Sequence, residues 1–215
     1  MTEILVLGDS HSPVFAHSTF KKAFLNLSFE VVTVIGATAS GLENPNSTTQ
    51  AYPIFRNAAE NSTAQKVIVM LGEVDTGFVI WYRAQKYQES VTAMMNKAIK
   101  CYANFLLELQ AKFDVICIST PLPTIEDGND WGEIANARRE VTASQVERTT
   151  LTLEFNRAMQ NFSEQNGICY VMLDLESLGK NGVVKTELRN HDPSNHHYDA
   201  DAYANLLIQK LTLVL

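Results

Sequence analysis

Cysteine is scarce in this chain: its 215 residues include only Cys101, Cys117 and Cys169, and no Cys-x-x-Cys pair. Disulfide frameworks and cysteine metal sites need paired spacing. The wide spacing and apolar surroundings therefore predict reduced, buried thiols and a cytoplasmic setting. A catalytic cysteine is the alternative that the same pattern leaves open.

Long apolar runs and basic clusters are also missing. No run approaches the roughly 20 residues of a membrane helix, and the first residues lack the basic and apolar regions of a signal peptide. The formal net charge of −7, without a basic stripe, argues against nucleic acid, because phosphate binding needs clustered lysine and arginine. We expect one domain over residues 1–215, with a small molecule rather than a membrane or nucleic acid as its partner.

Signatures of phosphate and metal binding are absent too. The sequence has no Gly-x-x-x-x-Gly-Lys-Ser/Thr loop and no Gly-x-Gly-x-x-Gly after its first apolar run. Potential zinc or manganese ligands do gather near the C-terminus, but without a His-Glu-x-x-His motif or a cysteine pair. We therefore expect no metal and no cofactor, although a metal site at these residues is the main rival chemistry: His191, Asp192, His196, His197 and Asp199.

Five short apolar runs alternate with longer segments of helical periodicity. The runs are rich in valine and isoleucine, and they cover residues 4–7, 31–35, 66–71, 115–119 and 169–173. Strands that alternate with helices are typical of an α/β fold, in which right-handed crossovers connect the strands of a parallel sheet. Apolar stripes between the third and fourth runs and before the fifth run predict two core-facing helices, and residues 199–215 predict a closing helix.

The first apolar run ends in Gly8-Asp9-Ser10. Ligands bind at the carboxyl ends of the strands in an open α/β sheet, so Ser10 is expected on a tight turn at the functional edge. A serine hydroxyl becomes a good nucleophile when a neighbouring base takes its proton. The alternative is that Ser10 serves only as the N-cap of the segment that follows.

Three further segments carry chemistry. Residues 192–199 precede the closing helix and offer imidazoles that can act as a base, with carboxylates that can orient them. Small residues at 36–41 follow the second run, where backbone N–H groups can approach a ligand closely, as an oxyanion site requires. The segment Gly72-Glu73-Val74-Asp75 follows the third run.

In this order, the four segments resemble the SGNH, or GDSL, hydrolases, and the resemblance spans nearly the whole chain. It implies a flavodoxin-like, three-layer α/β/α sandwich with a five-stranded parallel sheet. It also implies hydrolysis of esters or related acyl groups by a serine and a histidine. By this resemblance Ser10 is the nucleophile, and its N–H and that of Gly41 are oxyanion donors.

The histidine is chosen by the residues that follow it. In the family, a helix start with a small residue and an aromatic follows the catalytic histidine, and that spacing favours His197 over His196. Asp192 is the candidate orienting acid. A Ser–His dyad, or a backbone carbonyl as the orienting group, stays open as an alternative.

Two positions depart from the family. Val74 stands where the family has an asparagine that donates to the oxyanion, and Ser194 stands where the family has an aspartate. Losing one oxyanion donor typically costs about a hundred- to a thousand-fold in rate. Either Asn44 or Asn46 replaces the donor, or the chemistry is weak or different.

Other residues are candidates for the substrate site. Asp9 and His11 flank Ser10, and Glu73 and Asp75 are carboxylates of the third segment, although Asp75 can also be read as a turn or cap residue. The polar loops, with Trp131 as a candidate for stacking on a sugar ring, favour a small polar or carbohydrate-linked ester as substrate. An acyltransferase acting on a glycan, or a non-catalytic protein that binds a glycan or small ligand, are the alternatives. Three arginines are expected at the solvated surface, and would bind an anionic group if they entered the cleft: Arg83, Arg138 and Arg139.

Overall fold

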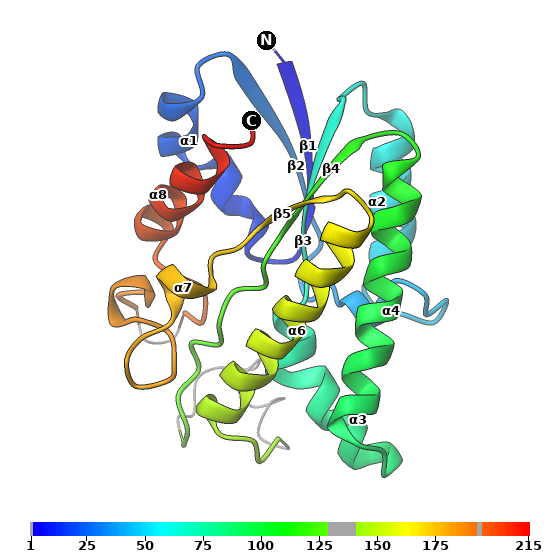
Figure 1. Ribbon diagram of the computed structural model, residues 1–215, viewed down its shortest axis with the longest axis vertical. Helices are drawn as coiled ribbons and strands as arrows, with labels where there is room; N and C mark the ends of the chain where they lie inside the picture. Colours follow the sequence, from blue (N-terminus) through cyan, green and yellow to red (C-terminus); the bar gives the residue numbers. More distant parts are fainter. Residues whose placement is uncertain (1, 129–140, 193–194) are drawn as a thin grey trace.

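The computed structural model describes residues 2–128, 141–192 and 195–215. Its centre is one sheet with the strand order β2-β1-β3-β4-β5, and every neighbouring pair is parallel. This confirms the predicted five-stranded α/β sheet (Figure 1). The strands are β1 (Thr2–Gly8), β2 (Leu27–Thr33), β3 (Lys66–Met70), β4 (Asp114–Ile118) and β5 (Cys169–Val171).

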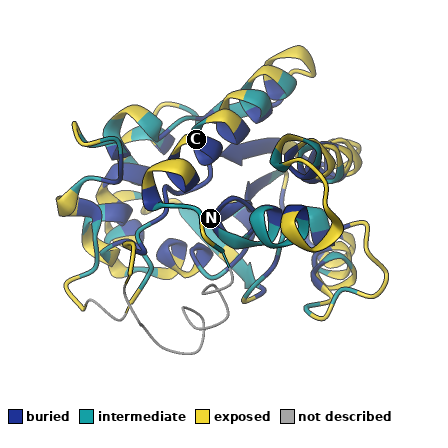
Figure 2. Cartoon of the chain, turned by 90° about the horizontal axis from the view of Figure 1, so that it is seen from below, coloured by how far each residue is buried: buried dark blue, intermediate teal, exposed yellow. Residues whose placement is uncertain are grey.

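Helices cover both faces of the sheet, and alternate residues of each strand divide between the two resulting cores. In β1, Leu5 and Leu7 belong to one core while Ile4 and Val6 belong to the other. This alternation explains the continuous apolar runs, since a strand that is buried on both faces has no polar side. Figure 2 shows dark blue on the central strands, teal on more peripheral parts of the sheet, and yellow on the outer helices and loops.

The first core holds the two long helices whose apolar stripes are visible in the sequence. Its helices are α2 (Ala51–Asn61), α3 (Ile80–Tyr87), α4 (Val91–Gln110) and α6 (Gln145–Gln165). The second core lies on the opposite face, where α1 packs against the closing helix α8. Its helices are α1 (Ser18–Ala23) and α8 (Ala200–Leu211), and the short α7 (Asp174–Ser177) follows β5.

The strand order also locates the functional edge. The chain leaves β1 to form β2 on one side and then crosses to β3 on the other, so the connections diverge between β1 and β3. In sheets of this order, ligands bind at the carboxyl ends of the strands that flank this point. The turn after β1 contains Ser10, and the segment after β3 contains Gly72 to Asp75.

The cysteines differ in part from expectation. All three thiols are free, but only Cys117 is buried, while Cys101 and Cys169 are half-buried. Burial raises the pKa of Cys117 to about 12 and that of Cys101 to about 11. Because the thiolate is the nucleophilic form, these shifts argue against cysteine catalysis at both positions.

Among the described residues, no helix is both long and apolar enough to cross a membrane, and no group of three or more histidine, cysteine, aspartate or glutamate residues is arranged to hold a metal. Four residues that the sequence singled out lie outside the described ranges: Trp131, Arg138, Arg139 and Ser194.

Candidate active site

Ser10 lies in a tight turn between the end of β1 and the short 3-10 helix η1 (Ser12–Ala16). The turn is compact: a Cβ added to Gly8 would lie 2.7 Å from Ser12 Cβ and 2.9 Å from the Met70 carbonyl oxygen. Ser12 Oγ donates to the Asp9 carbonyl at 2.8 Å and lies 2.7 Å from Thr33 Oγ1. Ser12 therefore fixes the turn from inside and leaves Ser10 half-buried at the strand edge.

Ser10 does not cap the following helices. The N-cap position of η1 is His11, and that of α1 is His17, whose side chain accepts from Thr19 N–H. The interpretation of Ser10 as only a helix cap is therefore wrong.

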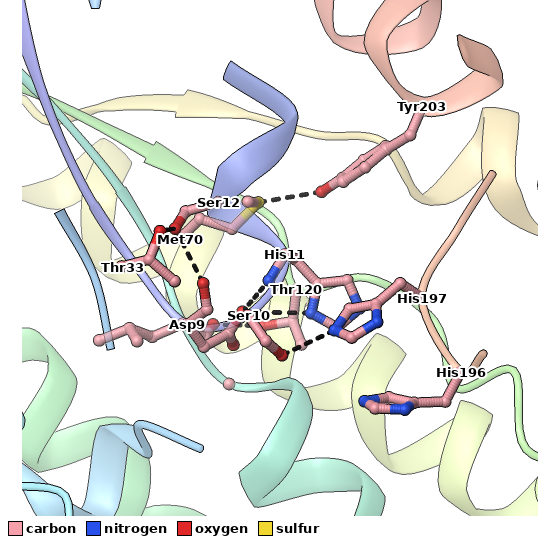
Figure 3. Close-up of polar contacts among 12 residues, drawn as sticks. Asp9, Ser10, His11, Ser12, Thr33, Met70, Thr120, His196, His197 and Tyr203 are labelled. Carbon is pink, nitrogen blue, oxygen red and sulfur yellow. Dashed lines mark hydrogen bonds and ion pairs between the residues drawn. The ribbon is translucent and has the colours of Figure 1, made fainter. Parts of the chain in front are cut away.

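His197 reaches Ser10 from the other end of the chain. Its Nε2 lies 2.8 Å from Ser10 Oγ, although 187 residues separate the two (Figure 3). Tyr198, the next residue, is buried, pairs with Arg189 in an isolated β-bridge, and accepts the Leu122 N–H through its hydroxyl at 2.8 Å. These contacts hold the end of the segment, and Asp199 then caps α8 by accepting the Ala202 N–H at 3.0 Å.

Asn195 is a neighbour of the His197 ring that the sequence reasoning missed. Its Oδ1 lies 2.9 Å from His197 Nδ1 and accepts the His197 backbone N–H at 3.0 Å. Asp192, the expected orienting acid, contributes its backbone carbonyl, which accepts the Asn195 N–H at 3.0 Å. The sequence did contain a hint of this contact. Asparagine side chains often accept the backbone N–H of the residue two positions later, which for Asn195 is His197.

His196 and His11 complete a cluster of imidazoles around His197. The ring of His196 lies 4.1 Å from that of His197, and the ring of His11 lies 4.7 Å from it, centroid to centroid. The His196 backbone carbonyl accepts the hydroxyl of Thr124. Figure 3 shows all three rings on the side of the turn where Ser10 projects.

A buried carboxylate lies behind this cluster. Asp9 is 0% exposed, and its Oδ1 accepts the His11 N–H at 2.9 Å and lies 3.1 Å from His11 Nδ1. Its Oδ2 is also buried and has no hydrogen-bond partner among the described residues. Asp9 therefore fixes the position of His11, which is itself buried.

The expected oxyanion donors differ in their availability. Within the described ranges, no residue accepts a hydrogen bond from the Ser10 N–H. The Gly41 N–H, in the 3-10 turn η2 (Ala39–Gly41), donates to the Thr38 carbonyl at 3.1 Å. Asn44 Oδ1 accepts the Asn46 N–H at 3.0 Å, so these two residues form a local turn.

Asp75 connects η2 to the segment after β3. Its carboxylate is 0% exposed, Oδ2 accepts the Ala39 N–H at 2.6 Å, and Oδ1 accepts the Ser40 N–H at 3.1 Å. Burial raises the pKa of Asp75, while the hydrogen bonds from Ser40 and Ala39 and the charge of Arg83 act in the opposite direction. Asp75 is the first residue of the π-helix η3 (Asp75–Val79), whose N-cap is Val74, and its side chain holds the neighbouring loop.

Arg83 is not a purely solvated side chain, as the sequence suggested. It is half-buried on α3, and its Nη1 donates to Ser40 Oγ at 2.9 Å. Arg83 and Asp75 therefore hold Ser40 from two sides, through its hydroxyl and its N–H.

Glu73 and Val74 occupy the start of this segment. Glu73 is 3% exposed, and its charge lies close enough to Tyr198 to contribute to that residue's raised pKa, of which burial is the main cause. Val74 is half-buried. As valine has no side-chain donor, it leaves this position without the hydrogen bond that an asparagine could supply.

A cavity of about 410 Å³ adjoins η2 between α2 and α4. Its wall includes Gly41 and Asn44, two carboxylates and no basic side chain. Asn104 Nδ2 donates to Glu43 Oε1 at 2.6 Å, and the Tyr52 hydroxyl donates to both Glu108 oxygens at 3.0 and 3.1 Å. These polar groups are thus bonded to one another, and Ser10 and His197 are not among the residues that line this cavity.

No family model and no curated protein matches this chain. Solved structures do match, over almost its whole length. They include a GDSL-like lipase from Bacteroides thetaiotaomicron, with a TM-score of 0.68 and 15% identity over 99% of this chain and 86% of that chain. A carbohydrate acetylesterase from Sinorhizobium meliloti has a TM-score of 0.65 and 10% identity, and covers 100% of both chains.

A third structure, the native aryl esterase of M. smegmatis, has a TM-score of 0.63 and 13% identity, again over 100% of both chains. At these identities the likeness shows the fold. The protein therefore has the three-layer α/β/α architecture of these esterases and lipases, with Ser10 at the carboxyl edge of its first strand.

Proposed function

We propose that the protein is a serine esterase of SGNH type that acts on a small polar ester through Ser10 and His197. One observation carries the proposal: Ser10 Oγ lies 2.8 Å from His197 Nε2 on a strand-end turn. That distance is within the reach of a general base to the proton that it removes. A serine with a hydrogen-bonded imidazole is the minimal device for activating a hydroxyl nucleophile.

The reaction has two halves. His197 Nε2 accepts the Ser10 proton while Oγ attacks the acyl carbonyl carbon, and the imidazolium then returns that proton to the leaving alcohol. Water attacks the acylated Ser10 in the same way, with His197 again accepting and returning a proton. The products are an alcohol and a carboxylic acid, and Ser10 is regenerated.

The developing oxyanion needs donors aimed at it. The Ser10 N–H is the first proposed donor, since the described residues leave it without an acceptor. The Gly41 N–H is the second proposed donor. It now donates to the Thr38 carbonyl, so this hydrogen bond has to break when substrate binds. Asn44 and Asn46 are the other proposed donors. Such bonds can tighten or rearrange in the substrate complex.

The proposed donors Gly41 and Asn44 line the cavity beside η2, which is the basis for proposing a polar, hydroxylated leaving group. The cavity beside η2 offers tyrosine, asparagine and glutamate side chains and no cation. One protein of this fold is a carbohydrate acetylesterase. We therefore propose a short acyl ester of a sugar or similar polyol as substrate, and Asp9, His11 and Glu73 as residues that shape the site around the acyl group.

The test uses a fluorophosphonate probe, which labels only an activated serine, together with hydrolysis of p-nitrophenyl acetate. The wild-type chain is expected to be labelled and active, and Ser10→Ala to abolish both. Ser18→Ala, an exposed serine at the start of α1, is the matched control and should behave as wild type.

The other outcomes are informative. Labelling with acyl transfer to an added sugar, and little release of acid to water, points to an acyltransferase. Binding of acetylated sugars without labelling indicates a non-catalytic binding protein. Val74 makes this outcome worth testing, because it stands where the family has an asparagine that donates to the oxyanion. Unchanged hydrolysis by Ser10→Ala would overturn the proposal.

A further inference from the structure

We infer that Asn195 is the third member of the catalytic group, a positioning residue that holds His197 in the tautomer with its proton on Nδ1. The inference rests on the proposed function and deepens it, because it assigns an orienting role to the neutral amide of Asn195. The sequence offered Asp192 for this role.

The orientation of the Asn195 amide follows from its two contacts. The His197 backbone N–H can only donate, so the Asn195 atom 3.0 Å from it must be the oxygen, Oδ1. The same oxygen lies 2.9 Å from His197 Nδ1. Two acceptors at that distance would repel each other, so Nδ1 must carry a proton and donate it to Oδ1.

The tautomer then fixes the role of the other ring nitrogen. A neutral imidazole with a proton on Nδ1 has an unprotonated Nε2. That Nε2 faces Ser10 Oγ at 2.8 Å, so it can accept the hydroxyl proton. The opposite tautomer would direct an N–H at Ser10 and leave no base. Asn195 therefore selects the form of His197 that can activate Ser10.

Hydrogen bonds within the loop hold the backbone of Asn195 in place. The Asn195 N–H donates to the Asp192 carbonyl at 3.0 Å, and the Asp192 N–H donates to Asn190 Oδ1 at 3.0 Å. The Asn195 side chain itself is exposed. Its replacement consequently removes the contact with His197 without opening a cavity, and the fold is expected to survive.

The first experiment reads the tautomer directly, by nitrogen NMR of the full chain labelled at histidine. His197 is expected to show a protonated Nδ1 and an unprotonated Nε2 in the wild type. Asn195→Ala should shift the ring toward the form with the proton on Nε2, and Asn195→Asp should restore the Nδ1–H form. A wild-type His197 protonated on Nε2 would overturn the inference.

The second experiment is kinetic. Asn195→Ala is expected to lower kcat on p-nitrophenyl acetate about 10- to 100-fold with little change in KM. This loss is a part of the roughly 10²- to 10⁴-fold rate increase that a general base contributes. Asn195→Asp should recover the rate and move the acid limb of the pH–rate profile to higher pH, because a carboxylate favours the imidazolium. Asn57→Ala, an exposed asparagine on α2, is the matched control.

Other titratable groups near the ring are part of this profile. They include His11, with Asp9 bonded to it, and His196 on the same loop. Their influence is present in wild type and in both Asn195 variants, so the difference among the three profiles isolates position 195.

The outcomes separate the two proposals. If Ser10 is not labelled and no ester is hydrolysed, the proposed function fails, while the NMR spectrum still reports on the tautomer. If Ser10 is labelled but Asn195→Ala keeps the wild-type spectrum, kcat and pH profile, then Asn195 makes only a local turn and this inference alone is wrong.

Discussion

The buried carboxylate of Asp75 accepts the backbone N–H of Ala39 at 2.6 Å, across 36 residues of sequence. Its second oxygen accepts the neighbouring Ser40 N–H at 3.1 Å. This pair of bonds ties the loop after β2 to the segment after β3. The loop that contains Gly41 is therefore held by a side chain from the segment that follows β3, on the edge of the sheet where Ser10 lies.

The first prediction concerns this link. Asp75→Asn is expected to lower the free energy of unfolding by about 1–3 kcal/mol, because one buried N–H loses its acceptor and meets an amide donor. It should also reduce kcat on p-nitrophenyl acetate, because η2 is no longer fixed. Urea denaturation and steady-state kinetics measure the two effects. Asp114→Asn, at an exposed carboxylate at the start of β4, is the control, and equal behaviour of the two variants would contradict the prediction.

The second prediction concerns the position without an oxyanion donor. Val74 is half-buried, so an asparagine can replace it without burying an unpaired amide in the core. Val74→Asn is expected to raise kcat at least about tenfold, towards the hundred- to thousand-fold that one donor is worth. Val74→Ala, which removes bulk without adding a donor, should give no such increase. If both variants behave alike, position 74 does not face the oxyanion.

The third prediction concerns Gly72. Its φ is +119°, and a Cβ there would lie 2.5 Å from Thr120 Oγ1 and 2.9 Å from Phe155 Cε1. Backbone strain and overpacking each cost about 1–3 kcal/mol, so Gly72→Ala should lower the free energy of unfolding by about 2–6 kcal/mol. Gly182 also has a positive φ, of +79°, but open space around it. Gly182→Ala should therefore show the smaller loss from strain alone, and equal losses in the two variants would count against the packing argument.

The fourth prediction concerns pH. Burial raises the pKa of Asp174 to about 6. The charge of Glu176 also contributes to this raised pKa, while hydrogen bonds from Asn156 and Ser119 lower it. The folded protein therefore binds this proton more tightly than the unfolded chain, and the contribution of Asp174 to stability falls as pH rises from about 4 to about 6.

Asp174→Asn keeps an oxygen for the 2.8 Å bond from Asn156 Nδ2 but carries no charge. It should stabilise the protein at pH 8 relative to wild type, by an amount on the order of 1–2 kcal/mol, and less at pH 4. Thermal or urea unfolding of both proteins across that range is the measurement. A difference that does not change with pH would show that charge at this position is not responsible.

Much of the fold could be predicted from the sequence, because its causes are local and periodic. The alternation of short valine- and isoleucine-rich runs with helical stripes correctly predicted the parallel α/β sheet. The strand boundaries were less accurate: the second apolar run was expected at 31–35, whereas β2 covers Leu27–Thr33. Its residues are only half-buried at this edge of the sheet, so hydrophobicity marks its limits poorly.

The sequence also pointed to Ser10, at the end of a buried apolar run, as a residue of the functional edge, and to His197 as its preferred partner. It could not predict the contact of Asn195 with His197 or the bonds from the loop after β2 to Asp75. Both depend on how irregular loops fold: one amide oxygen has to meet two groups of His197, and one buried carboxylate has to meet two N–H groups on another strand's loop.

By itself, then, the sequence determined the parallel sheet and the strand end that carries Ser10, since side-chain periodicity and glycine positions act over a few residues. Only the tertiary structure decided which groups meet Ser10, since those contacts join segments 187 residues apart through loops that have no period. There the position of each hydrogen-bond partner is set by packing and by the need to satisfy buried polar groups.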